Sequence, residues 1–135
     1  MTHIEPCRES DVAEVANLHR KVFHGVDAPA SDMLQAYYRK VFFENPWRRD
    51  DLPSLVCRGR DGSLLGFLGV VPRPMSLNNR PIWAAVAHRL MVAPQREAAF
   101  TAAKLVKGFL AGKQDLSSAT GRPTTEGASW KPRAP

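Results

Sequence analysis

Two features of the sequence could carry chemistry: a lone histidine in a predicted strand, and the start of the helix that follows. The strand covers residues 81–92, contains no carboxylate, and has His88 as its side chain that titrates near neutral pH. After Pro94 apolar residues recur at helical spacing, so the strand leads almost directly into an amphipathic helix. The first backbone N–H groups of such a helix lack intrahelical acceptors and point towards the strand end. We expect them to bind an anion such as a phosphate.

The residues that join this strand and helix resemble the acyl-CoA diphosphate loop of the GNAT superfamily, the acyl-CoA-dependent N-acyltransferases. That loop has the pattern Gln/Arg-x-x-Gly-x-Gly/Ala and follows a strand that ends in Val-x-Pro. Val92 and Pro94 match the strand end, Arg96 matches the first loop position, and Ala99 and Thr101 stand at the two glycine positions. A methyl group at residue 99 fits if its φ angle stays negative. The alternative is that these residues only start a core helix.

The resemblance implies an N-acyltransferase that moves an acetyl or other acyl group from acyl-CoA to the amine of a small molecule or peptide. Acetyl-CoA, or a related acyl-CoA, would be the co-substrate, and no metal would be needed. The strand surface that holds the pantetheine arm would come from Leu90, Met91 and Val92. The diphosphate loop would bind mostly through backbone N–H groups, with a threonine hydroxyl added. Its residues would be Arg96, Glu97, Ala98, Ala99, Phe100 and Thr101.

Acid and base groups are harder to assign. The amine must lose a proton before it attacks, and many family members use a glutamate or an ordered water chain near the fourth strand. Because this strand lacks a carboxylate, His88 is our candidate for the base or water holder, with a packing role as the alternative. A tyrosine general acid on a helix after the fifth strand is common in the family, but this sequence shows no pattern for such a helix. Tyr37, Tyr38 and Trp47 could contact the acceptor, although burial is the commoner role of such aromatic residues.

Composition favours one ordinary globular domain. The chain has 135 residues, of which 44% are hydrophobic, which suffices for a core. It contains no run of eighteen apolar residues, and its N-terminus is too polar for a secretory signal, so we expect a soluble, cytoplasmic protein without a membrane segment. Cys7 and Cys57 match no metal-ligand spacing and are expected to be reduced thiols in the core.

Charge is unevenly distributed along the chain. Residues 1–53 carry a net charge of −2 and residues 54–135 a net charge of +8. The basic half contains the proposed loop, and its field could attract either the phosphates of CoA or a nucleic acid. The Lys and Arg residues are scattered, and no zinc-finger spacing, RNP-like aromatic motif or helix-turn-helix pair is visible. We therefore expect no nucleic-acid partner, and a homodimer is left open.

The remaining pattern predicts the elements that position these residues. A strand at residues 2–6 is followed by a helix to residue 23, with Ser10 as N-cap, and by a second helix over residues 31–44, with Ser31 as N-cap. Strands over residues 55–57 and 64–71 are joined at an Asp-Gly turn, and a turn over residues 77–80 leads into the strand that carries His88. Ala102, Leu105, Val106 and Phe109 form the inner face of the next helix, and a fifth strand contains Leu116.

Prolines and glycines give further information about the strands in the middle of the sequence. Pro72 and Pro74 lack a backbone donor, which favours an edge or a bulge at that position. Gly66 and Gly69 permit a bend or the close approach of a neighbouring element.

This order of elements predicts an α/β fold: a GNAT-like mixed, mostly antiparallel sheet with helices on both faces. The resemblance further implies that the fourth and fifth strands splay apart. Residues 1–118 would form an incomplete GNAT-like acyl-CoA-binding domain, and residues 119–135 a disordered tail without apolar periodicity. The C-terminal half of the fold would be missing, either because the chain is a fragment or because the reading frame changes near Ser118.

Two functions therefore stay open. The first is acyl transfer from acyl-CoA to an amine, although activity of such a shortened chain stays an open question. The second is a catalytically inactive GNAT-like module that binds CoA or a partner protein. Ala99 at a glycine position, the absence of a carboxylate from the fourth strand and the missing C-terminal half favour the second.

Overall fold

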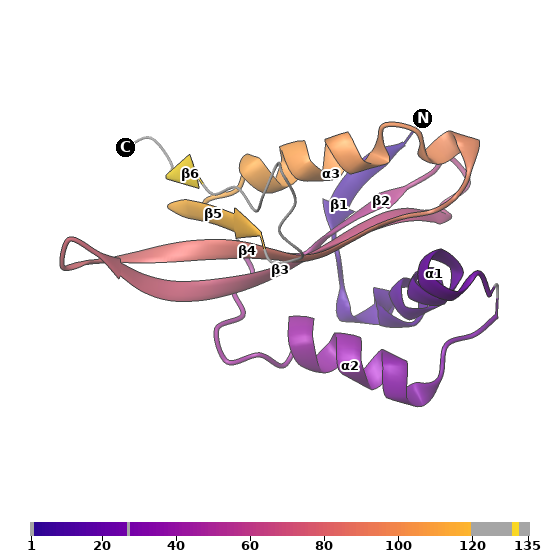
Figure 1. Cartoon of the computed structure of the whole chain (residues 1–135), viewed down its shortest axis with the longest axis horizontal. Coiled ribbons are helices and arrows are strands. Elements are labelled where there is room, and N and C mark those ends of the chain that lie inside the picture. Colours follow the sequence, from indigo (N-terminus) through magenta and orange to yellow (C-terminus); the bar gives the residue numbers. More distant parts are fainter. Residues whose placement is uncertain (1, 27, 120–130, 133–135) are drawn as a thin grey trace.

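The computed structural model describes residues 2–26, 28–119 and 131–132 of the chain. Figure 1 shows a twisted sheet between two helical layers. Its elements follow the predicted order: β1 (His3–Pro6), η1 (Glu9–Asp11), α1 (Val12–His24), α2 (Asp32–Phe42), β2 (Leu55–Arg58), β3 (Leu64–Leu77), β4 (Arg80–Val92), η2 (Arg96–Ala98), α3 (Thr101–Leu110), β5 (Leu116–Ala119) and β6 (Lys131–Pro132). No helix within the described residues is long and apolar enough to cross a membrane.

One sheet holds the six strands in the order β1-β2-β3-β4-β5-β6. Neighbouring strands are antiparallel except β4 and β5, which run parallel because α3 connects them across one face. α3 covers that face, and α1 and α2 cover the opposite face (Figure 1). The predicted α/β class, with a mixed, mostly antiparallel sheet and helices on both faces, is confirmed.

The C-terminal residues depart in part from the prediction. Ala119 closes β5, and Lys131–Pro132 form β6, which pairs with Ser117 and Leu116. These residues therefore belong to the sheet, although the sequence predicted an unstructured tail from residue 119. The rest of that tail, and the predicted splay of the strands beyond Ala119, lie outside the described residues.

Local hydrogen bonds decide where the first two helices begin. α2 starts as predicted, because Oγ of Ser31 accepts a hydrogen bond from the N–H of Leu34 at 3.2 Å. The prediction of Ser10 as the N-cap of α1 is wrong, since Ser10 lies within η1. Instead, the Asp11 carboxylate accepts a hydrogen bond from the N–H of Arg8 at 2.8 Å. This short turn fixes the entry of the chain into α1.

Two apolar layers hold the helices against the sheet. The layer under α1 and α2 contains Val15, Tyr38, Phe42, Phe67 and Met91, and the layer under α3 contains Cys57, Leu68, Leu105 and Phe109.

Glycines in β3 allow the helices to approach the sheet closely on both faces. A Cβ atom on Gly66 would lie 2.5 Å from Cγ2 of Thr101 in α3, and one on Gly69 would lie 2.3 Å from the Phe42 ring in α2. The predicted close neighbours of these glycines are therefore confirmed.

β3 and β4 form a hairpin that extends beyond the rest of the sheet (Figure 1). Its turn contains Asn78 and Asn79 in the left-handed region, with φ of 52° and 65°, as the sequence predicted. β2 pairs with the start of β3, up to Leu68, so the later part of β3 is an edge among the described strands. Pro72 and Pro74 lie on this predicted edge without interrupting the pairing with β4.

Candidate active site at the bulge of β4

The register between β3 and β4 changes at the middle of the sheet. Gly69 faces Arg89, whereas the next residue of β3, Val70, faces Ala87. His88 is therefore the extra residue of a β-bulge, a local change in pairing that redirects side chains. The strand pattern in the sequence predicted β4 but gave no sign of this bulge.

The bulge turns two consecutive side chains towards the same face. The ring centroid of His88 lies 6.0 Å from that of Phe42 in α2. The guanidinium carbon of Arg89 lies 5.6 Å from the centroid of the Phe23 ring in α1, and its Nη2 donates a hydrogen bond to the hydroxyl of Tyr37 at 3.3 Å. In a regular strand, neighbouring side chains would point to opposite faces. The site thus gains an imidazole and a guanidinium side by side.

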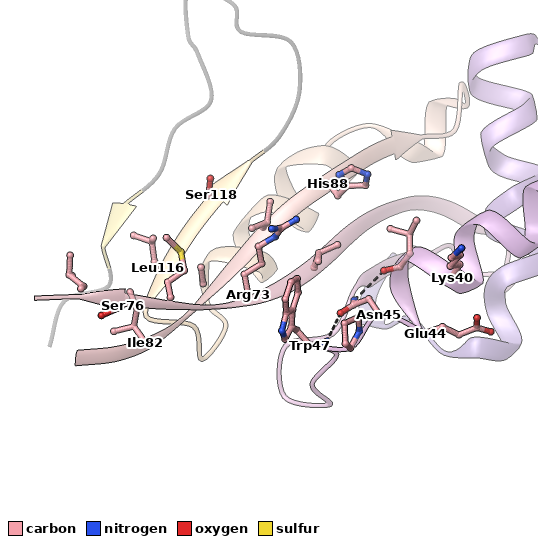
Figure 2. A pocket seen from close by; sticks show the side chains of 17 residues that line it. Lys40, Glu44, Asn45, Trp47, Arg73, Ser76, Ile82, His88, Leu116 and Ser118 are labelled. Atoms are coloured by element: carbon pink, nitrogen blue, oxygen red, sulfur yellow. Dashed lines mark hydrogen bonds between the residues drawn. The ribbon is translucent and has the colours of Figure 1, made fainter. Parts of the chain in front are cut away.

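A large cavity of about 1130 Å³ opens on the face of the sheet covered by α2. Figure 2 shows side chains from β3, β4, β5 and the loop after α2 around the same space. Its apolar wall includes Trp47, Val71, Met75, Ile82, Val86 and Leu116, and its polar groups include Lys40, Glu44, Arg73, His88 and Ser118. Residues of both β4 and β5, including His88 at the bulge, line this cavity.

A smaller cavity of about 390 Å³ lies on the opposite face, between β4, β5 and α3. Leu90 of β4 and Val106 and Leu110 of α3 form its apolar side, and each of the three side chains is between 41% and 52% exposed. The prediction placed Val106 on the buried side of the helix. The structure instead places it in the wall of this cavity.

His88 and Ser118 line both cavities, one on each face of the sheet. β4 and β5 pair from Ala84 and Leu116 to Ala87 and Ala119, so these two residues lie near the end of their described register. His88 and Ser118 are therefore the residues that the linings of the two cavities have in common.

The surroundings of His88 favour its neutral form. Burial lowers the pKa of the imidazole below its ordinary value of 6.5, and the positive charges of Arg89 and Arg73 lower it further. An imidazole with a lowered pKa is unprotonated at neutral pH and can accept a proton there.

Comparisons with known proteins identify the architecture. No family model and no curated protein matches this sequence. Among solved structures, a histone acetyltransferase HPA2-related acetyltransferase from Corynebacterium glutamicum matches with 15% identity and a TM-score of 0.62, over 98% of this chain and 97% of that one. A GNAT family acetyltransferase from Brucella melitensis in complex with acetyl-CoA matches with 20% identity and a TM-score of 0.59, over 90% of this chain and 77% of that one. The chain has the GNAT fold.

A further match with this fold comes from a much longer protein. It is the GCN5-related glucosamine N-acetyltransferase region of a fungal multi-domain β-N-acetylglucosaminidase, with 16% identity and a TM-score of 0.62. The match covers 90% of this chain and 14% of the fungal protein, so the likeness concerns one region of it.

In this GNAT-fold chain, the loop between β4 and α3 places its left-handed residue at Phe100, with φ of 68°. The resemblance had placed the glycine positions at Ala99 and Thr101, on either side of it. Ala99 has a φ of −56°, which satisfies the condition for a methyl group there. Phe100 thus adopts a conformation that costs a non-glycine residue energy, and its side chain is 81% exposed.

The start of α3 keeps the backbone donors that the sequence predicted. No side chain of the described residues caps α3, and its first helical hydrogen bond runs from the N–H of Lys104 to the carbonyl of Phe100 at 3.0 Å. The N–H groups of Thr101, Ala102 and Ala103 therefore precede the helical ladder. The predicted hydroxyl contribution of Thr101 is wrong, because its side chain is buried and its Oγ1 lies 3.9 Å from Sγ of Cys57.

The structure separates the predicted site residues into three groups. His88 and Leu90 line the cavities, with Leu90 on the α3 side. Met91 is buried under α1 and α2, where its sulfur accepts a hydrogen bond from the Tyr38 hydroxyl at 3.4 Å. The loop residues Arg96 to Thr101 line neither of these cavities and lie beyond the end of β4. Val92, the last residue of β4, lies between the cavity-lining residues of this strand and the loop.

Aromatic residues and newly found groups complete the site. Trp47 lines the large cavity, as the sequence allowed, whereas Tyr38 is a core residue. Arg73, Arg89 and Ser118 were missed by the sequence analysis. Arg89 depends on the bulge, Ser118 on the β4–β5 register and Arg73 on the pairing of β3 with β4, all of which are contacts between residues far apart in the chain.

Proposed function

We propose that this chain is an N-acyltransferase that moves an acyl group from an acyl-CoA to an amine. The observation that carries the proposal is that His88 and Ser118 line two cavities, one on each face of the sheet. Such an arrangement suits two substrates that react through the sheet. The GNAT fold supports the same reaction class, since one structural neighbour was solved with acetyl-CoA and another is a glucosamine N-acetyltransferase region.

The thioester substrate is assigned to the α3 side. The exposed apolar side chains of Leu90, Val106 and Leu110 provide a surface for its pantetheine arm. From His88 to Val92, β4 runs for about 13 Å towards the loop at the start of α3. There the backbone N–H groups of Thr101, Ala102 and Ala103, at the positive end of the helix dipole, would bind the diphosphate.

The amine is assigned to the large cavity on the α2 side. Its nitrogen attacks the thioester carbonyl carbon, a C–N bond forms and the C–S bond breaks. The nitrogen loses one proton, which the His88 imidazole accepts directly or through water, and the departing sulfur gains one. The products are an amide and a free thiol.

Neighbouring charges assist the deprotonation step. Arg73 and Arg89 lower the pKa of His88, and the same positive charges favour the neutral form of an amine bound beside it. Ser118 of β5, which also lines both cavities, would donate a hydrogen bond to the departing sulfur. His88 is therefore proposed as the base and Ser118 as a hydrogen-bond donor.

Two measurements test this function. Thermal unfolding is followed with increasing acetyl-CoA, since a ligand bound by the folded state raises the midpoint temperature. Release of free thiol is then followed with a panel of amines. A raised midpoint with amine-dependent thiol release is expected. A raised midpoint without turnover of any amine would instead support the inactive CoA-binding module, and no shift at millimolar acetyl-CoA would contradict both.

A further inference from the structure

Building on the proposed function, we propose that the acceptor is an amine joined through an apolar body to an anionic group such as a carboxylate. The inference comes from the composition of the large cavity beside His88. Apolar side chains from three strands and from the loop after α2 form most of its described wall. A hydrophilic acceptor such as a polyamine would leave this wall exposed to water, whereas an aromatic or aliphatic body would cover it.

The charged groups of the same wall are mostly positive. Lys40 and Arg73 line the cavity together with one carboxylate among the described residues, that of Glu44. A polycationic acceptor would need several carboxylates to balance its charge, and the wall supplies an excess of cations instead. An acceptor with a single amine and a negative group fits this balance.

Arg73 is the group best placed to bind the anionic end. Its guanidinium carbon lies 5.4 Å from the centroid of the Trp47 ring, so the side chain stacks on an aromatic face inside the cavity. Among the described residues no carboxylate forms an ion pair with it. A stacked guanidinium keeps its N–H donors in a planar fork, which matches the two oxygens of a carboxylate. In Figure 2 the side chains of Arg73, Trp47 and His88 surround the same space.

Arg89 adds a second positive charge next to the reaction point. Its Nε is buried and makes no hydrogen bond within the described part of the chain. Both arginines act on His88, so positive charge is concentrated around the place where the amine must bind. A negative group elsewhere on the same acceptor offsets this field and holds the amine against His88.

The spacing along the hairpin explains why an apolar body must separate the two groups. Arg73 pairs with Ala84, and Ala84 lies four residues before His88 on β4. This corresponds to about 13 Å of strand, part of which the Arg73 side chain can span. The amine and the carboxylate are therefore expected at opposite ends of a ring or short alkyl chain.

Three matched acceptors test the inference in the full chain with acetyl-CoA. 4-(Aminomethyl)benzoate has all three parts, benzylamine lacks the carboxylate, and spermidine is a polycation. We expect kcat/KM for the carboxylate compound to exceed that for benzylamine about tenfold, the size of a charge-assisted hydrogen-bonded pair. Spermidine should be the poorest acceptor. Equal values for the first two, or preference for spermidine, would overturn the inference while leaving acyl transfer established.

A variant links the preference to Arg73. In Arg73→Gln the ratio between the two aromatic acceptors should fall towards one, whereas Arg80→Gln, an exposed arginine near the hairpin turn, should keep it. Calorimetric titration of the same compounds in the presence of CoA measures binding without turnover. If 4-(aminomethyl)benzoate binds no more tightly than benzylamine, or Arg73→Gln leaves the ratio unaltered, the proposed anionic recognition is wrong even where the chain binds CoA.

Discussion

The two faces of the sheet around β4 are built differently. On the α3 side, Gly66 brings the helix close to the strands, and the cavity is small and apolar. On the α2 side, the cavity is nearly three times larger and contains most of the charged and aromatic groups. The bulge of β4 affects both faces, because His88, its extra residue, lines both cavities. The proposed function uses this difference, with the co-substrate assigned to the α3 face and the acceptor to the α2 face.

Packing on the α2 side can be tested by Phe42→Ala. Phe42 is 4% exposed, lies against Phe67 at a centroid distance of 5.3 Å, and contacts His88. We expect the free energy of unfolding to fall by about 3–5 kcal/mol, because a large buried ring is replaced by a cavity. Urea denaturation measures the change. Met33→Ala on the same helix is the control, since Met33 is 83% exposed and should change stability by less than about 0.5 kcal/mol.

The shared point of the two faces is tested by His88→Gln. Loss of the proposed base should lower kcat about 100-fold, while the shift of the melting temperature by acetyl-CoA is retained. His3→Gln replaces an exposed histidine of β1 and should keep full activity. Unchanged kcat in His88→Gln, measured by thiol release, would show that His88 is not the base.

The assignment of one substrate to each face is tested by filling each cavity separately. Val106→Phe on α3 should weaken CoA binding about tenfold and leave acceptor binding unchanged. Val86→Phe on β4 should raise the acceptor KM by a similar factor and leave CoA binding unchanged, at a cost of about 1–3 kcal/mol in stability from overpacking. Calorimetry with each ligand distinguishes the two effects. The opposite pattern would reverse the assignment of the faces.

The strained loop on the α3 side predicts a smaller effect. Phe100→Gly should increase the free energy of unfolding by about 0.5–1 kcal/mol, because glycine adopts the left-handed conformation without steric cost. Phe100→Ala keeps the backbone strain and should not stabilise the chain. Both are compared by urea denaturation, and equal stability of the two variants would show that the strain at φ of 68° is negligible.

The smallest expected effect is on the dependence of stability on pH. The pKa values of His19 and His88 are lowered in the folded state, in each case mainly by burial. The unfolded chain therefore binds more protons near pH 6, and stability should decrease as the pH falls below about 6.5. Each histidine should contribute well under about 1.4 kcal/mol per pH unit, since both are partly exposed to water. Urea denaturation between pH 7 and pH 5 should show a shallower slope for His88→Gln than for the parent chain.

Much of the fold could be predicted because its signals are local. The order of elements, the N-cap Ser31, and the asparagine turn of the long hairpin follow from neighbouring residues. Ser10 is not the N-cap because it lies within η1, where the carboxylate of the next residue accepts the hydrogen bond from the backbone. Local sequence patterns therefore predicted which helices and strands form better than they predicted where each one begins.

The site was only partly predictable for a different reason. The lack of a strand carboxylate made His88 a candidate, but its position depends on the bulge. The bulge also brings in Arg89, and the parallel register of β5 brings in Ser118. The left-handed conformation of Phe100 was not predicted, because a motif matched by residue type gives no φ angles. These features arise from tertiary pairing, which a single sequence does not display.

The two prolines on the edge of β3 also limit the pairing of this hairpin with other chains. Because Pro72 and Pro74 are two residues apart, both missing N–H donors fall on the same side of the strand, away from the intact ladder with β4. A strand from another molecule could not complete a continuous set of hydrogen bonds there. The hairpin can thus leave the exposed part of this edge, around Pro74, open to solvent without inviting intermolecular sheet growth.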